Sequence, residues 1–219
     1  MIQRVLLSTL PTQRTRIKFC GITRAEDARR AIGLGVDALG FVLVPASRRA
    51  LDIEAAAALR RELPPLVAAV ALLMDADREF IAQLVARVQP DLLQFHGSES
   101  PDLCRAWGRP YIKSVAMAEP QDLAAQSERY ADASALLLDG HQTGELGGQG
   151  TAFDWSRIAG GTRPLILAGG LKPDNVASAI GRVRPYAVDV SSGIESAPGL
   201  KDAALMQKFI EEVRRADAN

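Results

Sequence analysis

The side chains best suited to acid–base chemistry in this sequence stand where apolar runs end. Cys20 closes the run at residues 16–20, and Asp139 follows three leucines. A cysteine with a lowered pKa acts as a nucleophile or general base, although free cysteine is also a common small core residue. Desolvation beside apolar surface raises the pKa of a carboxyl group, which suits a general acid. The two residues therefore predict an acid–base pair, unless Cys20 belongs to the core and Asp139 only caps the turn at Gly140.

Two later apolar runs end in small residues and indicate an anion site. The run at residues 165–167 precedes the small residues 168–170, and the run at 187–190 precedes 191–193. Small residues let a ligand approach backbone N–H groups, and a helix that begins just beyond adds a partial positive charge. Two such turns after consecutive late strands predict a phosphate site.

Other polar side chains follow the remaining apolar runs. Arg49, beside Arg48, could bind a carboxylate through two parallel hydrogen bonds or be part of a solvated pair. Asp189 lies among valines, so it needs a partner and could orient the phosphate loops. Residues 147–150 could form a lid, but they lack the Lys-Ser/Thr of a nucleotide-binding P-loop. The candidate binding residues are Arg49, Gln94, His96, Gly148, Gly169, Gly170, Asp189, Ser191, Ser192 and Gly193.

The composition limits the partners and the compartment of the protein. Its 219 residues are 47% hydrophobic, and 26 basic residues balance 26 acidic ones, which argues against a nucleic-acid or membrane-surface role. Cys20 and Cys104 form no CxxC pair, so we expect a reducing, cytoplasmic location, with Cys104 in the core. His96 and His141 are far apart in sequence and show no zinc-ligand spacing. We therefore expect a small phosphorylated substrate and neither metal nor cofactor.

Strand and helix signals alternate along nearly the whole chain. Near-continuous apolar strands that alternate with helices are typical of a parallel sheet covered by helices. Eight such units favour closure into a (β/α)₈ TIM barrel, whose active face is the carboxyl end of the strands. Strands are predicted at residues 16–20, 36–44, 66–74, 90–95, 111–115, 135–138, 165–167 and 187–190. Helices are predicted near residues 23–34, 52–63, 77–88, 99–107, 120–130, 154–158, 174–180 and 202–213.

The boundaries of the predicted domain follow from the same pattern. No interior linker is long or polar enough to divide the chain, so we expect one barrel domain over residues 16–219. Residues 1–15 are expected to form an N-terminal extension. Thr23 and Glu26 have the spacing of a capping box, which predicts that Thr23 caps the first helix.

Several motifs, in the same order along the chain, resemble those of the phosphoribosylanthranilate isomerase family. The resemblance spans roughly residues 16–213, and the motifs together are specific, although the phosphate motifs alone occur in many barrels. The matching segments are KFCGIT at 18–23, GFV at 40–42, PASRR at 45–49, QFHG at 94–97, LD at 138–139, GGQGTAFDW at 147–155, AGGL at 168–171 and VDVSSGIE at 188–195.

The resemblance implies an aldose–ketose isomerase of tryptophan biosynthesis. The reaction would be the Amadori rearrangement of N-(5-phosphoribosyl)anthranilate to 1-(2-carboxyphenylamino)-1-deoxyribulose 5-phosphate, without metal or organic cofactor. The matching Cys20 would be the general base and Asp139 the general acid, while Arg49 would contact the anthranilate carboxylate. Val44 and Ala50 stand where the family often has aromatic residues, which affects the packing around the anthranilate ring.

Two alternatives stay open at this point. The related aminoaldose isomerase of histidine biosynthesis is one, but an aspartate is expected at the end of its first strand, where this chain has Cys20. A non-catalytic barrel that binds a phosphorylated sugar is the other, and a turnover assay separates it from an enzyme. The sequence is compatible with a monomer or a homodimer.

Overall fold

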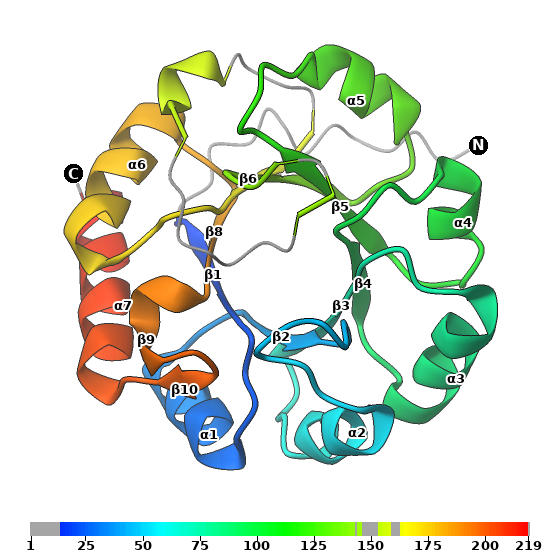
Figure 1. The fold of residues 1–219 in the computed structure, drawn as a ribbon. Coiled ribbons are helices and arrows are strands. Elements are labelled where there is room, and N and C mark those ends of the chain that lie inside the picture. The colour runs from blue at the N-terminus through cyan, green and yellow to red at the C-terminus, as the bar shows by residue number, and fades with distance from the viewer. Residues whose placement is uncertain (1–13, 143, 146–152, 159–162, 219) are drawn as a thin grey trace.

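The computed structural model describes residues 14–142, 144–145, 153–158 and 163–218 of the chain. Eight parallel strands form a closed barrel in chain order, and the last strand pairs with the first (Figure 1). The predicted (β/α)₈ barrel is thereby confirmed. The strands are β1 (Arg16–Cys20), β2 (Ala38–Val42), β3 (Ala68–Leu73), β4 (Leu92–Phe95), β5 (Tyr111–Ala116), β6 (Ala135–Asp139), β7 (Leu165–Leu167) and β8 (Ala187–Val190).

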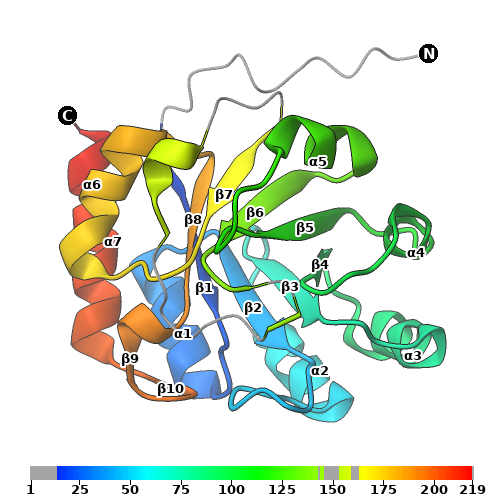
Figure 2. The ribbon, with the colours of Figure 1, turned by 45° about the horizontal axis from the view of Figure 1, so that its top comes forward.

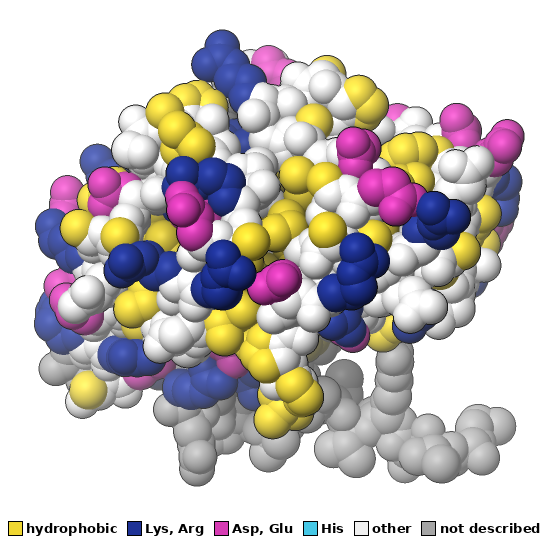
Figure 3. All heavy atoms as spheres, turned by 90° about the horizontal axis from the view of Figure 1, so that it is seen from below, with side chains coloured by type: hydrophobic (Ala, Val, Ile, Leu, Met, Phe, Trp, Pro, Cys, Tyr) yellow, Lys and Arg dark blue, Asp and Glu magenta, His cyan; other side chains and the backbone are white. Residues whose placement is uncertain are grey.

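Helices surround the barrel on its outer side, and Figure 2 shows the two last of them side by side. They are α1 (Ala25–Leu34), α2 (Ile53–Arg61), α3 (Arg78–Val88), α4 (Pro101–Arg105), α5 (Leu123–Arg129), α6 (Pro173–Val183) and α7 (Ala203–Asp217). Among the residues that the structure describes, no helix is long and apolar enough to cross a membrane. Basic and acidic side chains are interspersed over the face seen in Figure 3, as expected from the balanced charge.

Both faces of the barrel strands are buried, which explains their near-continuous apolar sequence. Inside the barrel, Val70, Ile112 and Leu137 pack together at less than one-tenth exposure. On the outer face, Phe19 of β1 meets Phe209 of α7 edge to face, with ring centroids 6.0 Å apart. The strands are therefore held from within by side-chain layers and from without by the helices, and their carboxyl ends are fixed in position.

The helix between β6 and β7 and the start of α1 differ from the sequence prediction. In residues 153–158 only the 3₁₀ turn η2 (Trp155–Arg157) is present, because the backbone is already extended again at Ile158. Thr23 does not cap α1; its hydroxyl donates to the Gly199 carbonyl at 2.6 Å, and Arg24 holds the cap position. Tertiary contact thus overrides the local capping pattern.

The hairpin that contains Gly199 was not predicted from the sequence. It follows the 3₁₀ turn η3 (Ser192–Ile194) and consists of the antiparallel strands β9 (Glu195–Ala197) and β10 (Leu200–Lys201). Its strands are only three and two residues long, too short to show the alternation that identifies a strand in sequence.

Candidate active site

A pocket opens at the carboxyl ends of the strands. Its volume is about 690 Å³, counted together with the solvent at its open mouth. It gathers nearly all of the site residues predicted from the sequence. Gly193 is not part of its lining, and Gly148, with the whole predicted lid at 147–150, lies outside the described residues. The predicted residues that line the pocket are Cys20, Arg49, Gln94, His96, Asp139, Gly169, Gly170, Asp189, Ser191 and Ser192.

Cys20 ends β1 and is buried against the neighbouring strand. Burial raises the pKa of its thiol, and the nearby Lys18 ammonium opposes this without reversing it. The sequence argument required a lowered pKa for a base. In the structure the pKa of the thiol is raised instead, because the thiol is desolvated. The position of a residue at the end of a strand does not reveal how deeply it is buried.

A buried ion pair lies beside the thiol. The Lys18 ammonium donates to both carboxylate oxygens of Asp189 at 2.9 Å, and the two residues are register partners on β1 and β8. Lys18 is thus the charged partner that the buried Asp189 carboxylate requires among its apolar neighbours. Lys18 was missed in the sequence reading, although a residue two positions before Cys20 points to the same face of a strand. Its place on that face puts a positive charge next to the thiol.

The absence of a side chain at Gly40 makes room for this arrangement. Gly40 is the register partner of Cys20 on β2, and a Cβ there would lie 2.8 Å from the Cys20 Sγ and 3.1 Å from the Lys18 Nζ. Both groups would have to move. Gly40 is therefore required by the close approach of two functional side chains.

We expect Gly40→Ala to lower kcat by about 10- to 100-fold, because a displacement of about 1 Å at a reacting group has that effect. Overpacking should also cost about 1–3 kcal/mol in the free energy of unfolding. Steady-state kinetics and urea unfolding measure the two effects. Gly33→Ala in α1 is the matched control, since a Cβ at Gly33 has open space around it, and it should leave kcat unchanged. An unchanged kcat in Gly40→Ala would show that the thiol position does not matter.

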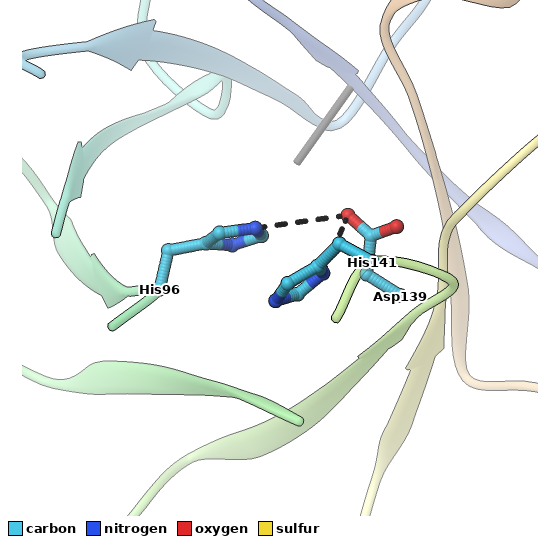
Figure 4. A group of neighbouring side chains, drawn as sticks. All are labelled: His96, Asp139 and His141. Carbon is cyan, nitrogen blue, oxygen red and sulfur yellow. Dashed lines mark ion pairs between the residues drawn. The ribbon is translucent and has the colours of Figure 1, made fainter. Parts of the chain in front are cut away.

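Asp139 ends β6 between two histidines that come from different loops (Figure 4). Its Oδ2 lies 3.8 Å from the His96 Nε2 and 3.6 Å from the His141 Nδ1, and the two imidazole rings stack with centroids 4.3 Å apart. Burial lowers the pKa of His96 to about 3, so this ring is neutral at neutral pH.

The protonation of Asp139 is the reverse of the sequence prediction. Burial alone raises the pKa of its carboxyl group, but contact with His141 and with the Gly140 backbone outweighs burial, and the pKa is lowered. His141 was considered in the sequence only as an isolated histidine. His141 stands two residues after Asp139, and its Nδ1 lies 3.6 Å from the carboxylate, a contact that the sequence pattern does not reveal.

Arg49 lies at the rim of the pocket and is held by a carboxylate of the chain itself. Its Nε and Nη2 donate to the two oxygens of Glu195 at 2.8 and 2.7 Å. Lys201 donates to Glu195 at 2.7 Å and to the Ser191 carbonyl at 3.0 Å. The short hairpin after β8 thus fixes the guanidinium beside the pocket, and Glu195 and Lys201 are site residues that the sequence reading did not single out.

The two predicted phosphate loops pack directly against each other. Gly169 and Gly170 adopt φ values of +74° and +64°, which favour glycine. A Cβ on Gly193 would lie 1.9 Å from the Leu171 carbonyl oxygen, so only glycine allows the loops to meet. Asn175 supports the first loop by donating to the Gly170 carbonyl at 2.9 Å. Gly193 therefore shapes the wall of the pocket from behind.

Cys104 is fully buried in α4 and has no place in the pocket, in agreement with the predicted core role. Active sites of closed (β/α)₈ barrels lie at the carboxyl ends of the strands. This pocket places proton-transfer groups and an anion-compatible loop pair at that end. The protein is thus a (β/α)₈-barrel enzyme for a small substrate.

Comparison with known proteins identifies the family. The model of the N-(5'-phosphoribosyl)anthranilate isomerase family matches residues 17–212. The enzyme of that name from Nitrosococcus oceani is 52% identical over 201 residues, which cover 91% of this chain and 98% of the relative. Its counterpart from Pseudomonas fluorescens is 49% identical over 203 residues, 92% of this chain and 97% of the relative. The chain belongs to the phosphoribosylanthranilate isomerase family.

Solved structures agree with this assignment. The phosphoribosylanthranilate isomerase of Thermotoga maritima superimposes with a TM-score of 0.81 at 40% identity, over 92% of this chain and 99% of that one. A structure of a phosphoribosylanthranilate isomerase in complex with reduced 1-(o-carboxyphenylamino)-1-deoxyribulose 5-phosphate gives a TM-score of 0.78 at 38% identity, with the same coverage. A dimeric form of the Thermotoga enzyme has also been converted to monomers.

Proposed function

We propose that this chain isomerises N-(5'-phosphoribosyl)anthranilate with Cys20 as the general base and Asp139 as the general acid. The reaction is that of its family, an intramolecular aldose–ketose conversion in tryptophan biosynthesis. The observation that carries the residue roles is that a thiol and a carboxyl group face one pocket from the ends of β1 and β6. This arrangement supports proton removal and proton delivery at two atoms of one small substrate.

The proposed steps need only acid, base and positioning. Asp139 delivers a proton to the furanose ring oxygen while the anilino nitrogen lone pair forms a C1′–N double bond, and the ring C1′–O bond breaks. Cys20 then removes the proton at C2′, which gives an enolamine. Protonation at C1′ and loss of the hydroxyl proton at C2′ complete the ketone. Each proton removed is returned, so no oxidant or reductant is consumed.

The binding groups have separate proposed tasks. The loops at Gly169–Gly170 and Ser191–Ser192 would take the phosphate through their backbone N–H groups, a suitable place for an anion. Arg49, positioned by Glu195, would contact the anthranilate carboxylate. Gln94 and His96 line the pocket near Asp139 and would contact the sugar. A cytoplasmic location is also proposed, since the Cys20 role requires a reduced thiol.

The pH dependence of kcat/KM should follow the pKa directions of the two groups. The reactive form has Cys20 ionised and Asp139 protonated, but the thiol pKa is raised and the carboxyl pKa is lowered. Between the two pKa values the reactive form is a small, constant fraction. Below the carboxyl pKa further thiolate is lost, and above the thiol pKa the carboxyl proton is lost, so kcat/KM falls about tenfold per pH unit on each side.

This profile assigns the acid limb to Asp139 and the alkaline limb, displaced above the usual thiol range, to Cys20. Initial rates up to about pH 11, and down to pH values below the ordinary aspartate pKa of about 3.9, with unfolding checked at each pH, measure it. A narrow optimum with an alkaline limb near neutrality would contradict the pKa directions. Asp139→Asn should remove the alkaline fall from the residual activity, which then rises with pH until the Cys20 thiol is ionised.

Inorganic phosphate should inhibit by raising KM without changing kcat, because it competes for the loop amides at the strand ends. Initial rates at several phosphate concentrations, with sodium chloride at matched ionic strength as the control, test this. Gly193→Ala should weaken both phosphate inhibition and substrate affinity, since the added Cβ forces the loops apart. Inhibition that leaves KM unchanged would place the phosphate elsewhere.

A turnover assay tests the proposed function itself. Freshly generated phosphoribosylanthranilate is mixed with the purified chain, and loss of the substrate fluorescence is followed. We expect multiple turnovers without added metal or cofactor. Saturable binding without loss of fluorescence would indicate a non-catalytic barrel, and turnover of the histidine-pathway aminoaldose alone would indicate the related isomerase.

A further inference from the structure

We propose that His96, Asp139 and His141 form a binding site for a divalent transition-metal ion such as Zn²⁺, and that the bound ion blocks Asp139. The metal-binding part is independent of the proposed catalytic roles, and the inhibition rests on them. No feature of the sequence pairs the two histidines as zinc ligands, because 45 positions separate them. Strands β4 and β6 bring them together at Asp139, where His96 lines the pocket and His141 does not.

The donor atoms are spaced as ligands of one ion. The Asp139 Oδ2 lies 3.8 Å from the His96 Nε2 and 3.6 Å from the His141 Nδ1, and the three donors lie within 4.8 Å of one another. Ligands about 2.0–2.1 Å from a tetrahedral Zn²⁺ lie roughly 3.3–3.5 Å apart. Binding of one ion would require the donors to close together and the two rings, now stacked with 23° between their planes, to rotate until both nitrogen lone pairs meet at the ion. Two histidines and one carboxylate are a donor set that zinc sites use.

The nearest partner of both histidine nitrogens among the described residues is the Asp139 carboxylate, at 3.8 and 3.6 Å, slightly beyond the distance of a normal hydrogen bond. His96 and His141 are only 6% and 7% exposed, and their Nε2 and Nδ1 atoms are both buried and unsatisfied. A buried polar atom without a partner is costly. Figure 4 shows both nitrogens directed toward the same Asp139 oxygen. An ion between them would satisfy both nitrogens at once and balance the carboxylate charge.

Gln94 lies next to the other ring nitrogen of His96 and supports the proposed metal site. Its side-chain amide lies 3.4 Å from the His96 Nδ1, and its own Oε1 is buried without a partner among the described residues. Turned about its last bond, the amide would accept a hydrogen bond from the Nδ1–H. That bond would leave the Nε2 lone pair free for a metal and orient the ring, as carbonyl oxygens that accept from the other ring nitrogen commonly do for metal-bound histidines.

Metal binding has a direct consequence for the reaction. A carboxylate oxygen bound to a divalent cation cannot carry a proton, so the metal-bound enzyme would lack its general acid. Three protein ligands leave one coordination position open to water or substrate. The ion is thus an inhibitor that competes with the Asp139 proton, and the reaction itself does not use it.

The experiment uses the untagged chain, whose two histidines are its only ones. Imidazole resonances are followed by NMR during titration with Zn²⁺, and the affinity is measured by calorimetry. We expect both histidines to shift together and to saturate at one equivalent. His141→Gln and Asp139→Asn should each weaken Zn²⁺ binding by roughly 10- to 100-fold or more. Cys20→Ser, which removes the pocket thiol, should retain the affinity. Thermal unfolding without metal shows that each variant is folded.

Several outcomes would overturn the site. They are no shift of either histidine, a shift of only one, or a Zn²⁺ affinity that Cys20→Ser removes and His141→Gln keeps. In the turnover assay, Zn²⁺ should inhibit wild type at the concentrations that shift the histidines, and EDTA should restore activity. Full activity of the Zn²⁺-saturated enzyme would refute the block on Asp139. A chain inactive even without metal would refute the proposed function but leave the binding result intact.

Discussion

Cys20→Ala should lower kcat by about 10²–10⁴ while the fold and the substrate KM stay close to wild type. The substitution removes the atom proposed to take the C2′ proton, and no other thiol lines the pocket. Removal of a small buried side chain beside Gly40 should be tolerated by the barrel. Steady-state kinetics, with circular dichroism to verify folding, measure the effect. A Cys20→Ala enzyme with near wild-type kcat would refute the base assignment.

Cys104→Ala is the matched control for this substitution. Cys104 is fully buried in α4 and away from the pocket, so its removal leaves a small cavity among core residues. We expect a loss of about 1–2 kcal/mol in the free energy of unfolding and no change in kcat. A large loss of kcat in a folded Cys104→Ala protein would contradict the core role.

Asp139→Asn should lower kcat by at least about 10², with little change in KM. Asparagine keeps the shape of the side chain and still forms hydrogen bonds, but it cannot deliver a proton to the furanose oxygen. The lost interaction belongs to the transition state, so kcat carries the effect. If Asp139→Asn keeps wild-type kcat, then His141 or a water molecule has to be the acid.

Asp75→Asn provides the comparison at the same end of the barrel. Asp75 follows β3 with a φ of +50°, a conformation that asparagine also tolerates, and its carboxylate accepts from the Ser98 N–H at 2.7 Å. It does not line the pocket. The change of charge is the same in both variants, so a kcat loss confined to Asp139→Asn separates proton transfer from a general effect of charge.

Local signals in the sequence predict the order of the barrel strands and the positions of Cys20 and Asp139 at strand ends. Apolar runs, helix caps such as Asp52 and Asp77, and the glycine at position 35 are local signals, and local backbone preferences decide them. Once eight strands alternate with helices, closure places every strand end on one face. Cys20 and Asp139 were therefore found to share a pocket without any knowledge of distances.

Only the tertiary structure decided the partners and the charges within the pocket. Lys18 and Asp189 are 171 positions apart, and Arg49 and Glu195 are 146 apart, so no spacing in the sequence joins them. Likewise, the Thr23 hydroxyl donates to the carbonyl of a residue 176 positions away and does not cap the helix that follows it.

The pKa directions of Cys20 and Asp139 also depended on the fold. Desolvation and nearby charge oppose each other at Cys20 and at Asp139, and the balance differs between them. The sequence suggested a lowered thiol pKa and a raised carboxyl pKa, whereas the structure gives the opposite directions. The outcome depends on burial depth and on which side chains the fold brings to the site, as it brings His96 from the end of β4 to within 3.8 Å of Asp139. Burial depth and neighbouring side chains both depend on the closed barrel. Neither can be predicted from the position of a residue at the end of a strand.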